Sequence, residues 1–290
     1  MLRAHNVSDG DGTMALEQSV ARHYTHGSLE RAILGALAAS GKDPDRLAPA
    51  DLAPVDEFHI GGRQATIDLA DQLEAGPGLH LLDVGSGLGG ASRFFADERS
   101  CRVTGIDLTE EYVRAAEALA RRVGLADRVS YRHGSALDLP FAPGTFDGAY
   151  MLHVGMNVED KARLFAEVRR VLRPGGLFGV YDVMREGGEG DLGFPVPWAS
   201  SPETSFVESA ATYRRLLGGA GFAVQKERGR RGFAIEFFRQ MRAQAVQGGG
   251  PPPLGLHILM GASAPQKAAN MMDNLERGLI APTEIIARAV

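Results

Sequence analysis

A glycine-rich turn directly after a buried apolar run constrains the fold of this chain more than any other feature. Residues 81–96 read LLDVGSGLGGASRFFA. Four glycines fall close together there, at Gly85, Gly87, Gly89 and Gly90. The apolar run before them is typical of a buried parallel strand, and the residues after them predict a helix. Glycines at such a turn let a nucleotide approach the backbone N–H groups closely, so the turn predicts a nucleotide site in an α/β sheet.

The middle of the chain alternates between strand and helix patterns. Further apolar runs predict strands near 101–108, 128–133, 145–152 and 176–184. Amphipathic helices are predicted after the second and fourth strands; Asn157 is expected to cap the latter helix and the segment LRPGG at 172–176 to end it. Because strands that alternate with helices pair in parallel, we predict an α/β fold with helices on both faces of the sheet.

The two flanks of this region have a different character. Residues 1–75 are mostly helical in pattern, and we expect them to form an N-terminal helical lid on a main domain of residues 76–290. A Gly/Pro-rich insertion near 185–206 is too long for a simple turn and is expected to belong to the lid. A second, helical insertion is predicted near 233–277, interrupted by GGGPPP at 248–253.

Composition and charge exclude several classes of partner. With 31 basic and 36 acidic residues, the formal net charge of −5 leaves no electrostatic footprint for nucleic acid or an anionic membrane. The N-terminal residues lack the apolar core of a secretion signal, and Cys101 is the only cysteine. No metal-ligand motif is present in the sequence, so we expect no metal site. We therefore expect a cytoplasmic protein that acts on a small molecule; whether it forms a homodimer stays open.

The residues around the turn leave more than one cofactor open. Gly85-x-Gly87-x-x-Gly90 fits the dinucleotide pattern, and Asp107 ends the second strand, where an acid that binds ribose belongs. An NAD(P)-dependent oxidoreductase is therefore one reading, and an inert binding module is another. Asp83 lies two residues before the first glycine, and a carboxylate there suits a cofactor with an ammonium or sulfonium centre better than an anionic pyrophosphate.

Five segments together resemble the class I S-adenosylmethionine-dependent methyltransferases. They are DVGSGLGG (83–90), TGIDL (104–108), GSALDLPF (134–141), FDGAYMLHV (146–154) and LRPGG (172–176). The resemblance covers roughly residues 60–230 and implies a Rossmann-like, doubly wound, mostly parallel seven-stranded sheet. Tyr24, the segment EFHIGG and the 185–206 insertion narrow it to the small-molecule group that includes sarcosine/dimethylglycine, coclaurine and ubiquinone-pathway methyltransferases.

The resemblance implies a role for each matching residue, with S-adenosylmethionine as the cofactor. Its methionine part would be surrounded by Asp83, Gly85, Gly87 and Gly89. Asp107 would bind both ribose hydroxyls, and the adenine would meet Leu108, Ser135, Ala136 and Leu137. Ser135 stands where many relatives have an acid that accepts from the adenine amino group. His153 would lie under the sulfonium.

The chemistry of methyl transfer limits what the acceptor side must supply. A sulfonium methyl is already activated, so most of the rate can come from holding the reactants in line in a dry site. A base is needed only for an acceptor that arrives protonated, and the candidate catalytic residues are His153, His59 and Tyr24. We expect the acceptor atom to be an amine nitrogen of a sarcosine-like metabolite, with O- or C-methylation of a natural product or quinone as the alternative.

Overall fold

A seven-stranded sheet forms the centre of the molecule. The computed structural model describes residues 8–247 and 253–290, so the first residues of the expected lid and most of the 248–253 break lie outside the described part. The strands are β1 (His80–Val84), β2 (Arg102–Asp107), β3 (Val129–His133), β4 (Phe146–Leu152), β5 (Leu172–Arg185), β6 (Phe222–Gly229) and β7 (Ile280–Ala289). Their order is β3-β2-β1-β4-β5-β7-β6, and only β7 runs antiparallel to its neighbours. The Rossmann-like, mostly parallel sheet that the sequence predicts is confirmed.

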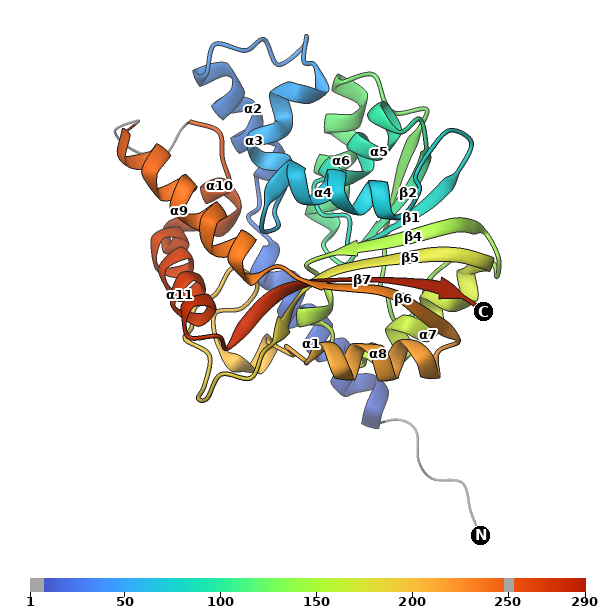
Figure 1. Ribbon diagram of the computed structural model, residues 1–290. Coiled ribbons are helices and arrows are strands. Elements are labelled where there is room, and N and C mark those ends of the chain that lie inside the picture. The colour runs from blue at the N-terminus through green and yellow to red at the C-terminus, as the bar shows by residue number, and fades with distance from the viewer. Residues whose placement is uncertain (1–7, 248–252) are drawn as a thin grey trace.

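Helices cover both faces of this sheet (Figure 1). One face carries α4 (Gly62–Gln72), α5 (Gly90–Glu98) and α6 (Glu110–Arg122), whose apolar sides share a core with Leu81, Val103 and Tyr150. The opposite face carries α7 (Lys161–Val171) and α8 (Ala210–Gly219), which pack on Phe178 and Ile285. Amphipathic helices bury their apolar stripes in this way, and they leave the carboxyl ends of the parallel strands open for a ligand.

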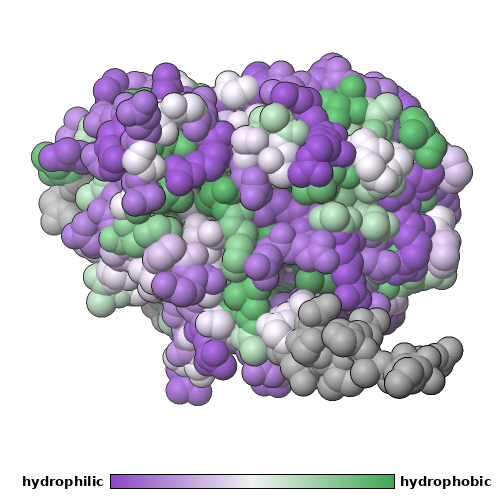
Figure 2. Space-filling view, turned by 90° about the horizontal axis from the view of Figure 1, so that it is seen from below, coloured by the Kyte–Doolittle hydropathy of each residue, from purple (hydrophilic) through white to green (hydrophobic). Residues whose placement is uncertain are grey.

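The remaining helices gather around that open edge. They are α1 (Ser8–Tyr24), α2 (Leu29–Ala39), α3 (Ala53–Asp56), α9 (Arg231–Gln247), α10 (His257–Met260) and α11 (Ala264–Glu276), with short 3₁₀ turns at Pro49–Leu52, Gly155–Asn157, Pro202–Thr204 and Gly261–Ser263. Helix α2 packs on α6, and α10 contacts α2, so both flanks of the chain meet. Seen from below, an apolar strip crosses the surface between hydrophilic margins (Figure 2). In the described part of the chain, no helix is both long and apolar enough to span a membrane.

Two expectations about α7 are wrong. The cap of α7 is Asp160, whose side chain accepts the Arg163 N–H, and not Asn157, which lies in the preceding 3₁₀ turn. The helix also does not end in a glycine cap, because Leu172 is already extended (ψ 140°) and pairs with Phe146 in the sheet. The LRPGG segment is therefore the irregular first part of β5.

Candidate functional site

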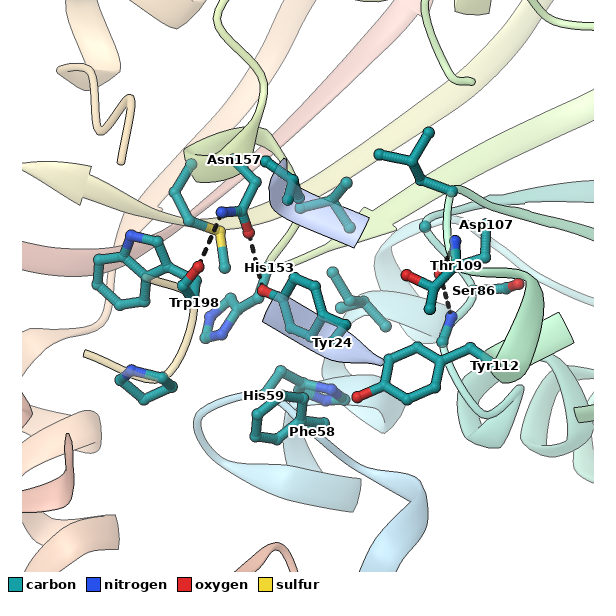
Figure 3. A pocket seen from close by; sticks show the side chains of 18 of the residues that line it. Tyr24, Phe58, His59, Ser86, Asp107, Thr109, Tyr112, His153, Asn157 and Trp198 are labelled. Carbon is teal, nitrogen blue, oxygen red and sulfur yellow. Dashed lines mark hydrogen bonds between the residues drawn. The ribbon is translucent and has the colours of Figure 1, made fainter. Parts of the chain in front are cut away.

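One pocket at the carboxyl ends of the parallel strands brings together most of the residues singled out from the sequence (Figure 3). It extends from the glycine turn to the C-terminal helices α9–α11. The predicted site residues that line it are Tyr24, His59, Asp83, Gly85, Gly87, Asp107, Leu108, Ala136, Leu137 and His153. Two predicted site residues, Gly89 and Ser135, are not among its lining residues.

The glycine turn presents bare backbone to this pocket. Gly85 and Gly87 both have left-handed backbone angles, with φ of 71° and 52°. A Cβ on Gly85 would collide with Val154, whereas a Cβ on Gly87 would meet nothing within 4 Å and would point into open space. The N–H of Gly87 donates to Oδ2 of Asp107 at 2.8 Å. Gly87 is therefore the glycine whose missing side chain leaves room for a ligand.

The two predicted residues outside the pocket make other contacts. A Cβ on Gly89 would collide with the Tyr131 ring, so this glycine is required for packing between the turn and β3. The Ser135 hydroxyl donates to Glu17 on α1 and accepts the N–H of Leu137 at 3.0 Å. Ser135 thus faces α1, and its hydrogen bond holds the Glu17 carboxylate, which lines the pocket.

Two carboxyl groups flank the turn, one buried and one half-buried. Asp83 is 2% exposed, and its burial raises its pKa to about 7 against the opposing hydrogen bond from Ser92 at 2.6 Å. Burial also raises the pKa of Asp107, although the N–H groups of Gly87 and Thr109 each donate to its carboxylate at 2.8 Å. A cationic ligand group would favour the ionised form of Asp83.

Two histidines meet on the other side of the pocket. The rings of His59 and His153 lie 6.0 Å apart, edge to face. Burial lowers the pKa of His59 to about 4 and that of His153 well below its usual value, so both are neutral at pH 7. Nε2 of His59 contacts the Gly62 carbonyl at 3.2 Å and the Thr66 hydroxyl at 3.0 Å. Nε2 of His153 is buried and has no hydrogen-bond partner among the described residues.

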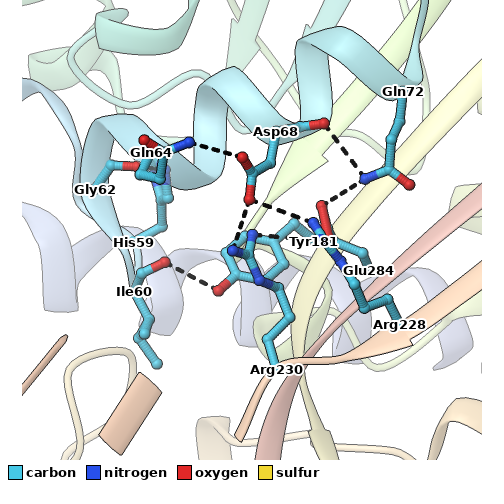
Figure 4. A network of polar contacts seen from close by, with 10 residues as sticks. All are labelled: His59, Ile60, Gly62, Gln64, Asp68, Gln72, Tyr181, Arg228, Arg230 and Glu284. Atoms are coloured by element: carbon cyan, nitrogen blue, oxygen red, sulfur yellow. Dashed lines mark hydrogen bonds and ion pairs between the residues drawn. The ribbon is translucent and has the colours of Figure 1, made fainter. Parts of the chain in front are cut away.

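The position of His153 depends on an unusual backbone conformation. Its φ of 54° is rare for a residue with a side chain and places it in a strained left-handed turn at the end of β4. Its N–H donates to the Tyr181 carbonyl at 2.7 Å, and the two rings pack 5.0 Å apart. The Tyr181 hydroxyl in turn donates to the Ile60 carbonyl at 3.0 Å and so fixes the segment that carries His59 (Figure 4).

Ion pairs and a hydrogen bond connect α4 to β6, to β7 and to Arg230, which follows β6. Arg230 pairs with Asp68 at 2.7 Å, and Arg228 pairs with Glu284 at 2.5 Å (Figure 4). Gln72 also donates to Glu284, at 2.9 Å. These contacts tie α4 to β6 and β7, and so they stabilise the support of both histidines rather than the pocket itself.

Helix α1 closes one wall of the pocket through polar contacts. The Tyr24 hydroxyl donates to Oδ1 of Asn157 at 2.8 Å, and the Asn157 amide donates to the carbonyls of Trp198 and Thr204. Burial raises the pKa of Tyr24, so its phenol stays protonated near neutral pH. Trp198 is 2% exposed; it lines the pocket, and its indole N–H donates to the Ser205 hydroxyl at 2.9 Å.

The acceptor side of the pocket is apolar, which sequence reasoning missed. Besides the predicted residues, the lining includes Leu16, Val20, Phe58, Met156, Phe237, Phe238, Met241, Leu259, Met260 and Met271. No lysine or arginine of the described residues lines this pocket. Arg63, on α4, pairs with Glu98 and lies over the Phe94 ring. No cluster of metal-binding side chains occurs in residues 8–247 and 253–290.

Comparison with known proteins identifies a methyltransferase domain in this chain. Residues 82–180 match the model of a methyltransferase domain. The chain is 36% identical over 129 residues to the erythromycin 3''-O-methyltransferase of Saccharopolyspora erythraea, which covers 43% of this chain and 42% of that protein. It is 30% identical over 183 residues to the methyltransferase GfsG of Streptomyces halstedii, with 62% and 64% covered. The chain spans less than two thirds of the length of these curated relatives.

The structure has the same fold as solved methyltransferases. The geranyl diphosphate C-methyltransferase of Streptomyces coelicolor superposes with a TM-score of 0.68 at 19% identity, covering 95% of this chain and 98% of that one. The sarcosine dimethylglycine methyltransferase from Galdieria sulphuraria gives a TM-score of 0.63 at 18% identity, with 78% and 85% covered. These matches leave no support for the oxidoreductase reading. The chain therefore carries a methyltransferase domain, and its fold is that of the class I S-adenosylmethionine-dependent methyltransferases, as its sequence motifs predict.

Proposed function

We propose that this chain binds S-adenosylmethionine at the glycine turn and transfers its methyl group to a hydroxyl oxygen of an uncharged, apolar small molecule. The observation that carries the proposal is one continuous pocket, with carboxylates and bare backbone at one end and apolar side chains at the other. The two neutral histidines lie where these halves meet. Polar and apolar groups arranged in this way around a single cavity are typical of a small-molecule site.

The end of the pocket at the glycine turn fits S-adenosylmethionine. Open space above Gly87 provides room for the ligand to approach the backbone. Asp107 retains acceptor lone pairs for the two ribose hydroxyls, because each of its oxygens takes a single backbone N–H. Asp83 offers a buried carboxyl to the cationic methionine part. When bound, the cofactor supplies an activated methyl group on a positively charged sulfur.

The residues of the chain would then orient the acceptor and accept its proton. A hydroxyl must lose its proton as the oxygen attacks the methyl carbon, so a neutral base within the pocket is required. His153 is suited to this step, because its imidazole is neutral at pH 7 and its Nε2 is buried with no hydrogen-bond partner among the described residues. His59 is less suited, because its Nε2 is engaged by Gly62 and Thr66. Tyr24, with its raised pKa, would remain an orienting donor.

The lining of the acceptor half supports an apolar substrate over a sarcosine-like one. A carboxylate or phosphate on the acceptor would be buried without a cationic partner, because no lysine or arginine of the described residues lines the pocket. Aromatic and methionine side chains instead favour a large apolar body. Curated relatives include O-methyltransferases and sterol C-methyltransferases. These features favour a hydroxyl oxygen or a carbon as the methylated atom, which the sequence analysis gives as the alternative, over an amine nitrogen.

A nucleophilic alkene carbon is a second candidate acceptor. Methylation of an alkene creates positive charge on carbon, and aromatic faces stabilise such charge. Phe58, Tyr24, Tyr112 and Trp198 all line the pocket. His153 could then remove the proton that the carbocation must lose. Identification of the methylated atom in the product distinguishes this candidate from the first.

The base is tested by replacing His153. We expect His153→Gln to lower the rate of methyl transfer to a hydroxyl acceptor by about 10²–10⁴-fold, because the substitution removes the proposed general base. The affinity for S-adenosylhomocysteine, measured by calorimetry, should stay nearly unchanged. His26→Gln, at an exposed histidine, serves as the control. An unaltered rate in His153→Gln would show that the acceptor needs no base from this residue.

A further inference from the structure

A carboxylate from outside the matched domain reaches the nucleotide side of the pocket. Glu17 lies on α1 and lines the same pocket as Gly134, Ala136 and Leu137, which follow β3. Its Oε1 accepts a hydrogen bond from Ser135, whose hydroxyl also accepts the N–H of Leu137 at 3.0 Å. The carboxylate is thus fixed to the loop after β3 by a side chain that is itself fixed to the backbone.

The hydrogen bond from Ser135 engages one oxygen of this carboxylate, Oε1. The Glu17 side chain lines the pocket, where a ligand can meet it. An ionised carboxylate only accepts hydrogen bonds, so its partner must be a donor. The pocket residues on either side of Ser135 are Gly134 and Ala136, whose side chains offer no donor.

The position of Glu17 relative to Asp107 indicates which part of a nucleotide it would meet. This step rests on the proposed function, which places the ribose at Asp107, the last residue of β2. The base then extends from Leu108 toward Ala136 and Leu137, because β3 is the edge strand beyond β2. Glu17 is held on that loop by Ser135, so the outer edge of a base in this position would meet it.

We propose that Glu17 reads the exocyclic 6-amino group of the purine and makes this pocket selective for an adenine cofactor. Adenine presents an N–H donor at that position, whereas hypoxanthine and guanine present a carbonyl oxygen. A carboxylate accepts from the first and repels the second, so Glu17 discriminates both by attraction and by repulsion. Since Glu17 belongs to α1, recognition of the base depends on a helix that lies outside residues 82–180.

Binding of two matched ligands tests this assignment. S-adenosylhomocysteine and S-inosylhomocysteine differ in the 6-amino and 6-oxo groups and in the proton that the latter carries on N1. Their affinities can be compared by calorimetry. The wild-type protein should prefer the amino ligand by about 10- to 100-fold, the range expected for a hydrogen bond to a charged group. In Glu17→Gln the side-chain amide can accept or donate, so the preference should fall toward equal affinity. Glu117→Gln, at an exposed glutamate on α6, should keep the wild-type ratio.

The ratio of the two affinities separates specific recognition from general damage. Loosening of α1 would weaken both ligands alike and leave the ratio unchanged. An unchanged ratio in Glu17→Gln, with the wild type still binding S-adenosylhomocysteine, overturns the assignment of Glu17 and leaves the proposed function standing. A wild-type protein that binds neither ligand contradicts the proposed function itself and this inference with it.

Discussion

Buried carboxyl groups set the electrostatics of the cofactor half at the scale of single residues. Burial raises the pKa of Asp83, and the neighbouring carboxyl groups of Asp107 and Glu57 raise it further. A carboxyl group with a pKa of about 7 is partly protonated at neutral pH. A cation bound beside it would stabilise the ionised form and displace the proton. Binding of a cationic cofactor is therefore coupled to pH.

The affinity for S-adenosylmethionine should rise with pH. Below the raised pKa, Asp83 is protonated and offers no charge to the cation, so binding must first release the proton. From pH 5.5 to 7 the ionised fraction grows on the order of tenfold for a pKa near 7, and the affinity should increase by a similar factor. Calorimetric titration across this range measures it, with Asp83→Asn as the variant that should lose the pH dependence. A wild-type affinity that stays constant across this pH range would show that the ionisation of Asp83 does not contribute to binding the cationic ligand.

Individual residues also show how far sequence reasoning reaches. Asp107, Gly85 and Gly87 line one pocket, and they could be grouped from the sequence because a strand–turn–helix unit fixes their geometry locally. Gly89 and Ser135 belong to the same motifs, yet their contacts are with Tyr131 and Glu17. These partners come from another strand and from α1, so no local pattern could reveal them.

At the scale of elements, the N-terminal helices are part of the folded core as well as a wall of the pocket. Leu29, Ile33 and Leu37 of α2 are at most 1% exposed and share a cluster with Tyr112 and Leu119 of α6. Deleting them would expose this cluster, so point substitutions test the lid better than truncation does. Closure of these helices over the cofactor stays a prediction.

The glycine turn allows a matched test of backbone geometry at this scale. Gly87 and Gly124 both have left-handed φ, and neither has an atom within 4 Å of a Cβ placed on it. Valine at either position should therefore cost a similar free energy of unfolding, at least about 1–2 kcal/mol. Only Gly87→Val should lose S-adenosylhomocysteine binding, since Gly124 lies at the end of α6. Thermal melting and calorimetry of both variants give the comparison, and retained affinity in a folded Gly87→Val protein would refute the role of this glycine.

The elements also show the limit of prediction. Local periodicity predicts strands β1 to β5 and helices α2, α4, α9 and α11 because each follows from neighbouring residues. The acceptor wall does not follow from any segment alone. It forms where α1, the 185–206 insertion and α9–α11 meet, and this meeting is set by long-range packing such as α10 on α2.

At the scale of the whole molecule, a common nucleotide-binding sheet is combined with an acceptor wall built from both flanks of the chain. Polar contacts join these parts across the pocket. Tyr24 on α1 reaches Asn157 after β4, and His23 contacts the Pro197 carbonyl at 3.1 Å. The absence of lysine and arginine from the pocket lining, among the described residues, then limits the acceptors that can enter.

The most direct test of the central claim is the rate of label transfer from methyl-labelled S-adenosylmethionine to matched acceptors. Naphthol, a hydroxynaphthoate and dimethylglycine compare a neutral apolar hydroxyl compound with its carboxylate and with a small zwitterionic amine. We predict methylation of the naphthol oxygen, with kcat/KM lower by at least roughly 100-fold for the hydroxynaphthoate, because its carboxylate would be buried without a partner. Dimethylglycine should not be methylated. Preferential methylation of dimethylglycine or the hydroxynaphthoate would contradict the account.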